Sequence, residues 1–312
     1  MNKMNSNPST QINLFEHKEI FNQLYKLSKN DTLPNKILLS GEKGIGKSTL
    51  AYHLINLVLS ENEDYPYDYE NNIINSNNKS YKLVQNKSNP NFHLIDLLED
   101  KKSIDINQIR ELIINLNKSS FNKKKRFVLI DNIELLNLNS INALLKILEE
   151  PNENINFILI NNNKRVLPTL KSRCLNFKVF LTKDQSIRIV NQLLNDDINN
   201  FINNDLFDYY ATPGKLFKLV NLSEEYKLDF LNFDLIKTIK TMIRDKIYKK
   251  DKSVIEIIYS FVELYFRKNI SIENISVLKS YHYFLKKINN TRVYNLDEEI
   301  LLMEFEDKIL NG

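Results

Sequence analysis

The chain has 312 residues, 42% hydrophobic and 26% charged, which is enough apolar material for the cores of two or three domains. Its net charge of +4 is too small to indicate nucleic-acid binding by itself, and its single cysteine, Cys174, excludes an internal disulfide and a cysteine-rich zinc site. No stretch approaches the ~20 apolar residues of a membrane span and residues 1–11 are polar, so we expect a cytoplasmic protein without membrane contact.

The first expected elements lead into a glycine-rich loop. Apolar residues at helical spacing predict a helix within residues 15–27, and the apolar run 37–39 predicts a buried strand. Residues 41–49 read Gly-Glu-Lys-Gly-Ile-Gly-Lys-Ser-Thr, and the stretch 50–59 after them predicts a helix. A strand, this loop and a helix in that order are the setting of a phosphate-binding loop.

The residue types in this loop suit a nucleoside triphosphate. Glycines permit tight turns that aim several backbone N–H groups at one point, beside the positive end of the helix dipole. Lys47 can reach the terminal phosphates, and the Ser48 hydroxyl can bind the magnesium ion that accompanies ATP or ADP. We therefore expect nucleotide binding, from which hydrolysis does not follow. The expected nucleotide-binding residues of the loop are Gly41, Gly44, Gly46, Lys47, Ser48 and Thr49.

Residues 61–130 contain one polar stretch and two apolar ones. Residues 61–82 are rich in Asn, Asp and Tyr and lack periodicity, so we expect a surface insertion with weak local structure. Strands are expected at 92–98 and 127–130, with a helix over 106–117 between them that Asp105 caps.

Asp131 follows the second of these strands directly. P-loop proteins place a carboxylate near the magnesium ion by ending an apolar strand in this way, so Asp131 is expected to be a magnesium ligand beside Ser48. The alternative is that Asp131 caps the next helix.

A helix and a further strand come next. The helix at 140–149 ends before Pro151, and a buried strand at 155–160 is followed by Asn161 and Asn162. We assign Asn162 to the nucleotide site as a polar sensor of the terminal phosphate, with Asn161 as the other candidate. A turn that merely ends the strand explains both residues equally well.

The alternation of strands and helices stops at about residue 180. Up to that point it predicts a parallel sheet with helices on both faces, the α/β class. From residue 182 only helical patterns recur, and those of the last third, including a capping box at 253–256, fit a helical bundle. Its aromatic residues are expected to form the bundle core.

Three motifs together resemble one family. The loop at 41–48, Asn-Ala-Leu-Leu-Lys-Ile-Leu-Glu-Glu-Pro at 142–151 and Leu-Pro-Thr-Leu-Lys-Ser-Arg-Cys at 167–174 resemble the clamp-loader ATPases of DNA replication, a branch of the AAA+ superfamily. The resemblance covers about residues 33–219. It implies a nucleotide-binding AAA+ domain at 1–180, a helical lid at 181–230 and a helical collar for oligomerisation at 231–312, with ATP or ADP and Mg²⁺ as ligands.

Three departures separate this chain from the motor subunits of that family. Motor subunits resemble one another in ending the acidic strand in Asp-Glu, whereas Asp131 is followed by Asn132, whose amide cannot act as a base. Their four zinc-binding cysteines have no counterpart, so no zinc is expected. Lys215 replaces the usual Arg of the lid motif at 211–216; it keeps the charge that contacts the nucleotide but lacks the forked geometry.

These departures favour the delta-prime class, which often does not hydrolyse ATP. The resemblance then implies that Arg173, in Ser-Arg-Cys at 172–174, reaches across a subunit interface and completes the ATP site of a neighbouring motor subunit. An arginine supplied in trans stabilises the charge that spreads over the transferred phosphoryl group. The alternative is an arginine that caps the preceding segment or pairs with a local carboxylate.

The implied partners are gamma/tau-like motor subunits and a delta subunit of DNA polymerase III. The assembled complex would act on the sliding clamp and primer–template DNA, and the chain's own ATPase activity would be weak or absent. Two other functions remain open. In the first, the chain is itself an active clamp-loader ATPase, and Glu134 or another carboxylate replaces the missing base. In the second, it is a helicase loader or another DNA-processing P-loop protein.

Overall fold

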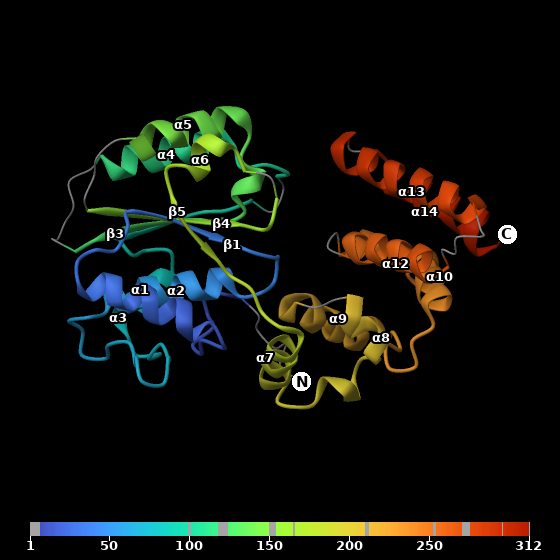
Figure 1. The fold of residues 1–312 in the computed structure, drawn as a ribbon, viewed down its shortest axis with the longest axis horizontal. Coiled ribbons are helices and arrows are strands. Elements are labelled where there is room, and N and C mark those ends of the chain that lie inside the picture. Colours follow the sequence, from blue (N-terminus) through green and yellow to red (C-terminus); the bar gives the residue numbers. More distant parts are fainter. Residues whose placement is uncertain are drawn as a thin grey trace. The chain divides into compact units, whose positions relative to one another are not determined.

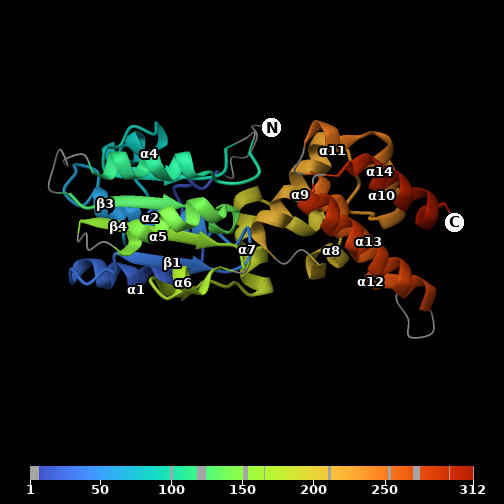
Figure 2. The same ribbon diagram turned by 90° about the horizontal axis from the view of Figure 1, so that it is seen from above.

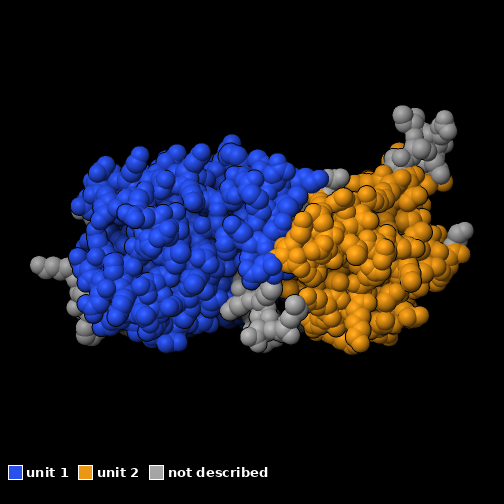
Figure 3. Space-filling view, turned by 90° about the horizontal axis from the view of Figure 1, so that it is seen from below, with its two compact units in different colours: residues 1–195, 212–215 blue, residues 196–211, 216–312 orange. Residues whose placement is uncertain are grey.

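The structure is a computed structural model that describes residues 7–98, 101–117, 124–149, 154–164, 166–209, 212–251, 254–269, 275–294 and 296–311. The chain forms two compact units, one of residues 1–195 with 212–215 and the other of residues 196–211 with 216–312 (Figure 3). The division into three domains stays a prediction. No helix among the described residues is long and apolar enough to cross a membrane.

The first unit is built on a parallel sheet of five strands in the order β2-β3-β4-β1-β5. The strands are β1 Lys36–Ser40, β2 Phe92–Ile95, β3 Arg126–Ile130, β4 Ile155–Asn161 and β5 Leu175–Lys178. β2 is shorter than the expected strand at 92–98. Because consecutive strands are parallel, all five end at the same edge of the sheet, and the segments that follow them gather there.

Helices cover both faces of this sheet (Figure 1). Residues of α1, α2 and α3 pack on one face with Ile37 and Leu39, whereas Leu38 faces the other side with residues of α4 and α5. Figure 2 shows α4 and α5 lying side by side over that second face. The helices of this unit are α1 Lys18–Lys29, α2 Lys47–Leu59, α3 Lys79–Gln85, α4 Ile106–Leu116, α5 Leu138–Glu149, α6 Pro168–Lys171 and α7 Lys183–Leu194, with a 3-10 turn at Ile133–Leu135.

The predicted class, an α/β domain with a parallel sheet covered by helices and followed by a helical region, is confirmed. The predicted cap of α4 is also present, because the Asp105 carboxylate accepts hydrogen bonds from the Asn107 and Gln108 N–H groups and Gln108 completes a capping box. The expected helix end at Pro151 and the expected cap at Ser253 lie outside the described residues.

Every regular element among the described residues of the second unit is a helix or a helical turn. Phe261, Phe266 and Phe284 are fully buried in it, as expected of the aromatic core, whereas Tyr281, expected there too, is only partly buried. α9 Pro213–Tyr226 leads into this unit. The other elements are a 3-10 turn Ile198–Asn200, α8 Asn204–Tyr209, α10 Leu235–Arg244, α11 Ile247–Lys250, α12 Val254–Asn269, α13 Ile275–Tyr294, α14 Glu298–Phe305 and a π-helical turn Glu306–Leu310.

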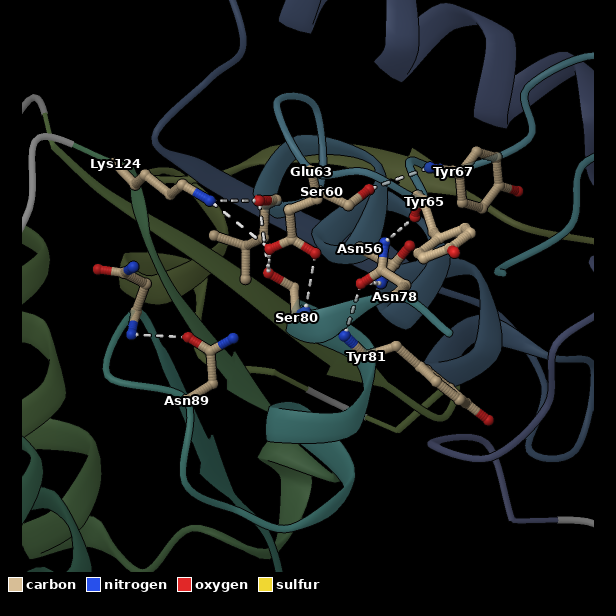
Figure 4. A network of polar contacts seen from close by, with 12 residues as sticks. Asn56, Ser60, Glu63, Tyr65, Tyr67, Asn78, Ser80, Tyr81, Asn89 and Lys124 are labelled. Atoms are coloured by element: carbon tan, nitrogen blue, oxygen red, sulfur yellow. Dashed lines mark hydrogen bonds and ion pairs between the residues drawn. The ribbon is translucent and has the colours of Figure 1, made fainter. Parts of the chain in front are cut away.

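The prediction for residues 61–82 was right about the surface position, since many of these residues are exposed, and wrong about weak local structure, since several side chains of this inserted segment pack into the core. Tyr67, Ile74 and Tyr81 are buried in the core of the first unit. Asn78 is fully buried; its side chain accepts from the Asn56 amide and the Tyr81 N–H, and donates to the Tyr65 carbonyl (Figure 4).

A second group of contacts fixes the end of the inserted segment. The Glu63 carboxylate accepts from the Ser80 N–H and from the Ser80 hydroxyl, at 3.0 and 2.6 Å, and the Lys124 ammonium lies 3.7 Å away (Figure 4). Buried polar groups need hydrogen-bond partners, and in this segment side-chain amides and hydroxyls provide them between residues that are separated by turns. The segment therefore has order without the apolar periodicity by which sequence patterns are recognised.

Candidate nucleotide site

The candidate site begins at the glycine-rich loop between β1 and α2. Gly44 and Gly46 have φ values of 88° and 92°, a backbone conformation that side chains disfavour. Gly41 is required for a different reason, because a Cβ there would lie 2.2 Å from the Val179 carbonyl oxygen. The loop thus depends on each of its three glycines, and α2 begins at Lys47 directly after them.

Lys47 is folded back over this loop. Its side chain is buried, with 3% of the residue exposed, and its ammonium donates to the Gly41 carbonyl at 3.0 Å and to the Glu42 carbonyl. Burial lowers the pKa of Lys47 to about 8, although the charges of Asp131 and Glu134 oppose that shift. The hydrogen bonds of this buried ammonium go to neutral carbonyls, so a phosphate would give it a charged partner.

Ser48 and Asp131 lie side by side next to this lysine. The Ser48 hydroxyl donates to the Asp131 carboxylate at 2.6 Å. Burial raises the pKa of Asp131, as does the nearby charge of Asp96, while the hydrogen bond from Ser48 lowers it. Two hard oxygen ligands beside a phosphate loop suit Mg²⁺, which binds through one or two protein oxygens together with phosphate and water.

This donor set fits a nucleoside triphosphate with Mg²⁺. Among the described residues no group of three or more His, Cys, Asp or Glu side chains is placed to hold a metal alone. The magnesium site would therefore need oxygens of the nucleotide to complete it. The Asp131 side chain contacts Ser48 and the Asn132 N–H, and Thr49 follows in the first turn of α2.

Asn162 and Glu134 meet at the same edge of the sheet. The Asn162 amide donates to the Asn132 side-chain oxygen at 2.8 Å and to the Glu134 carboxylate at 2.9 Å. The Asn132 amide in turn donates to Asp96. Glu134 reaches this position because Asn132 adopts a left-handed conformation, φ 56°, and opens a single 3-10 turn. The neighbouring Asn161 instead uses its side chain in a local turn with Lys164.

The start of the lid motif also contacts the phosphate loop. The Gly214 N–H donates to the Gly44 carbonyl at 2.8 Å, and a Cβ on Gly214 would lie 2.8 Å from the Gly44 Cα. The Lys215 side chain is exposed. Thr212 is buried beside Gly44, and its hydroxyl has no hydrogen-bond partner within the described residues. A polar atom in that condition is a candidate ligand contact.

Arg173 lies at the opposite edge of the sheet. It follows α6 and stands two residues before Leu175, which pairs with Ile37 at the start of β1. The five residues of β1 span about 16 Å between that edge and the loop. The guanidinium donates to the Thr169 carbonyl at 2.7 Å and pairs with Glu149, so the pair with a local carboxylate foreseen as the alternative is present in the isolated chain.

Three residues near the site were missed by sequence reasoning. Asp96 follows β2 as Asp131 follows β3, so the same strand-then-carboxylate pattern could have identified it. Thr212 lies at the start of the lid motif, where only Lys215 was considered. His17 lies outside the motifs described above, yet its ring contacts the Ile45 carbonyl of the phosphate loop, and no local pattern in the sequence signals that contact.

Comparisons with known proteins find relatives among the subunits of DNA polymerase III. A model of the family described as DNA polymerase III, delta subunit, matches residues 16–182. DNA polymerase III subunit delta' of Buchnera aphidicola subsp. Schizaphis graminum is 24% identical over 289 residues, which cover 86% of this chain and 83% of that protein.

Two further relatives match over shorter stretches. Subunit delta' of Pseudomonas aeruginosa is 32% identical over 44% of this chain and 40% of its own length. Subunit gamma of the same Buchnera is 32% identical over 53% of this chain and 43% of its own length, so these two matches span less than half of each relative. Among solved structures, a gamma subunit-related protein of DNA polymerase III from Thermotoga maritima has 20% identity and a TM-score of 0.48, with 90% of this chain and 96% of that chain covered.

The lowered pKa of Lys47 predicts a specific pH dependence of stability. An unfolded lysine, with its ordinary pKa of 10.5, keeps its proton to higher pH than the buried one, so the unfolded state binds more protons between pH 8 and 10.5. The free energy of unfolding of the wild type should therefore rise relative to Lys47→Met, by about 1.4 kcal/mol per pH unit at most. Urea titrations at pH 7 to 10 measure it.

The control for this experiment is Lys43→Met, because Lys43 is an exposed lysine of the same loop. Its free energy of unfolding should follow that of the wild type at every pH. A difference between the wild type and Lys47→Met that stays constant from pH 7 to 10 would contradict the account of Lys47.

Proposed function

The chain belongs to the family of DNA polymerase III delta subunits, and from this membership we propose that it is a delta-prime-like subunit of a bacterial clamp loader. In this role it assembles with gamma/tau-like motor subunits and a delta subunit, and it provides Arg173 to the ATP site of a neighbouring motor subunit. The assembled complex places the sliding clamp on primer–template DNA.

The position of Arg173 is the observation that carries this proposal. Arg173 stands at the amino edge of the sheet, and its own phosphate loop follows the far end of β1, about 16 Å away. An arginine so placed cannot stabilise charge at its own nucleotide site. Any part that it plays in phosphoryl transfer therefore requires the nucleotide of another subunit.

The pair between Arg173 and Glu149 is compatible with such a role. The two side chains are 32% and 56% exposed, and exposed ion pairs contribute only about 0–1 kcal/mol. A neighbour's phosphates, at an interface from which water is excluded, offer a guanidinium stronger and bidentate hydrogen bonds. Docking would thus replace the carboxylate of Glu149 at little cost.

The chain's own site would bind ATP or ADP with Mg²⁺. In this proposal the loop N–H groups and Lys47 hold the phosphates, Ser48 and Asp131 hold the magnesium ion, and Asn162 lies where the terminal phosphate would be sensed. Bound magnesium would neutralise phosphate charge. Hydrolysis would be weak or absent because Asn132 cannot take a proton from water. Lys215 and Thr212 are further candidates for nucleotide contact.

Removing the Arg173 guanidinium should disable a neighbouring site. We expect Arg173→Ala to assemble normally and to lower turnover at the site it completes by about 10³-fold or more, the usual effect of losing an arginine finger. Arg173→Lys should recover little of the turnover that Arg173→Ala loses, since the lysine side chain lacks the planar, forked guanidinium. The measurement is ATP hydrolysis, stimulated by clamp and DNA, of a complex reconstituted with each variant.

Lys171→Ala is the matched control. It removes a positive charge two residues away in α6, on an exposed side chain, and should leave turnover unchanged. Gel filtration shows whether each complex is intact. Unchanged turnover by an intact complex containing Arg173→Ala would refute the role in trans.

A second candidate function, ATP hydrolysis by the chain itself, is favoured by the position of Glu134. Its carboxylate reaches the carboxyl edge of the sheet, where it accepts from Asn162 close enough to Lys47 to act on that lysine's pKa. A base in this position could orient an attacking water.

The own-hydrolysis candidate predicts measurable turnover by the isolated chain. Glu134→Gln should then abolish it, because an amide cannot accept the proton of water. Our proposal expects the isolated wild type to hydrolyse ATP no faster than Glu134→Gln. A clear difference between the two, measured as phosphate release, would favour the second candidate.

A further inference from the structure

His17 touches the phosphate loop from a distant part of the sequence. Its Nε2 lies 2.5 Å from the carbonyl oxygen of Ile45, 28 residues further along the chain. A carbonyl oxygen only accepts hydrogen bonds, so Nε2 must carry the proton that it donates. The side chain is buried, and burial lowers the pKa of its imidazole.

This hydrogen bond fixes the orientation of the next peptide group. The Ile45 carbonyl and the Gly46 N–H belong to one planar trans peptide, in which the two groups point in opposite directions. By holding the carbonyl toward α1, His17 turns the Gly46 N–H to the other side. Within the described chain that N–H has no hydrogen-bond partner. It is therefore available to donate to a phosphate.

The backbone at His17 is strained, and strain of this kind persists only where the surroundings enforce it. Glu16 and His17 have φ values of 56° and 24°, and neither residue is a glycine. On one side the Glu16 carboxylate accepts hydrogen bonds from Arg188 at 3.0 Å and from Gln185 at 3.2 Å, both in α7. Glu16 thereby holds the chain just before the histidine.

The inserted segment and α2 hold the residues that precede this bend. Four hydrogen bonds reach residues 10–14, from the Tyr81 hydroxyl to the Thr10 carbonyl, from His53 Nε2 to the Gln11 carbonyl, from the Ile74 N–H to the Ile12 carbonyl, and from the Leu14 N–H to the Asn72 carbonyl. The Tyr67 hydroxyl donates to the other nitrogen of His53. The inserted segment therefore positions residues 10–14, which lead into His17.

We infer that His17 is a positioning residue for the nucleotide: its Nε2–H holds the Ile45 carbonyl so that the Gly46 N–H is aimed at a phosphate, and the inserted segment keeps it there. The inference rests on the proposed binding of nucleotide by the chain's own loop. According to this inference, residues 61–82 stabilise the position of residues 10–14 and, through them, that of the phosphate loop.

The test compares two amides that differ by one methylene. The Gln side chain can place its amide nitrogen where His Nε2 lies, whereas that of Asn is too short to reach the Ile45 carbonyl. His17 precedes α1 with a φ of 24°, a positive value that Asn tolerates better than most residues, so His17→Asn should fold. Urea unfolding of each variant verifies this.

The measurement is the affinity of the full chain for ADP with Mg²⁺ by isothermal titration calorimetry. His17→Asn should weaken binding about tenfold, the effect of one hydrogen bond, and His17→Gln should stay within about twofold of the wild type. His282→Asn, at an exposed histidine of α13, should bind as the wild type does.

Equal affinity of His17→Asn and the wild type would overturn the inference, and so would an equal loss in His17→Asn and His17→Gln, which would reveal a packing role only. A wild type that binds no ADP would overturn the proposed nucleotide binding as well. These results are distinct, so the failure of one proposal cannot be mistaken for the failure of the other.

Discussion

The parallel direction of the five strands is the constraint on which this molecule depends. It brings the loop after β1 and the residues that follow β2, β3 and β4 to a single edge of the sheet. Lys47, Asp131 and Asn162 meet there although they are far apart in sequence. The same constraint sends Arg173, which precedes β5, to the other edge. The residues suited to binding phosphate thus lie at one edge of the sheet, and Arg173 lies at the other, too far away to contact a phosphate at this site.

Holding a buried lysine at the phosphate edge requires support from outside the loop. Burial lowers the pKa of Lys47, and its ammonium donates hydrogen bonds to the carbonyls of Gly41 and Glu42 in the loop. Contacts from α1 through His17, and from the start of α9 through Gly214, brace the loop on two sides. The site is therefore a product of several segments, and the loop sequence alone does not build it.

The sequence predicted the features that local rules determine. The loop glycines, the carboxylate after β3 and the Asp105 cap each follow from a short pattern with a fixed geometry. The packed segment at 61–82 and the contact of His17 could not be predicted, because hydrogen bonds between distant residues produce them. Asn78, for example, is buried by partners at Asn56 and Tyr65, and no periodicity records such pairs. Glu134 reached the site through a left-handed Asn132 that the sequence does not signal.

The most direct measurement is the structure of the assembled clamp loader with a non-hydrolysable ATP analogue. The account predicts that the Arg173 guanidinium lies about 3 Å from a terminal phosphate oxygen of the nucleotide in the adjacent subunit, with its pair to Glu149 broken. A complex in which the neighbouring site holds the analogue while Arg173 remains paired with Glu149 would contradict the central claim.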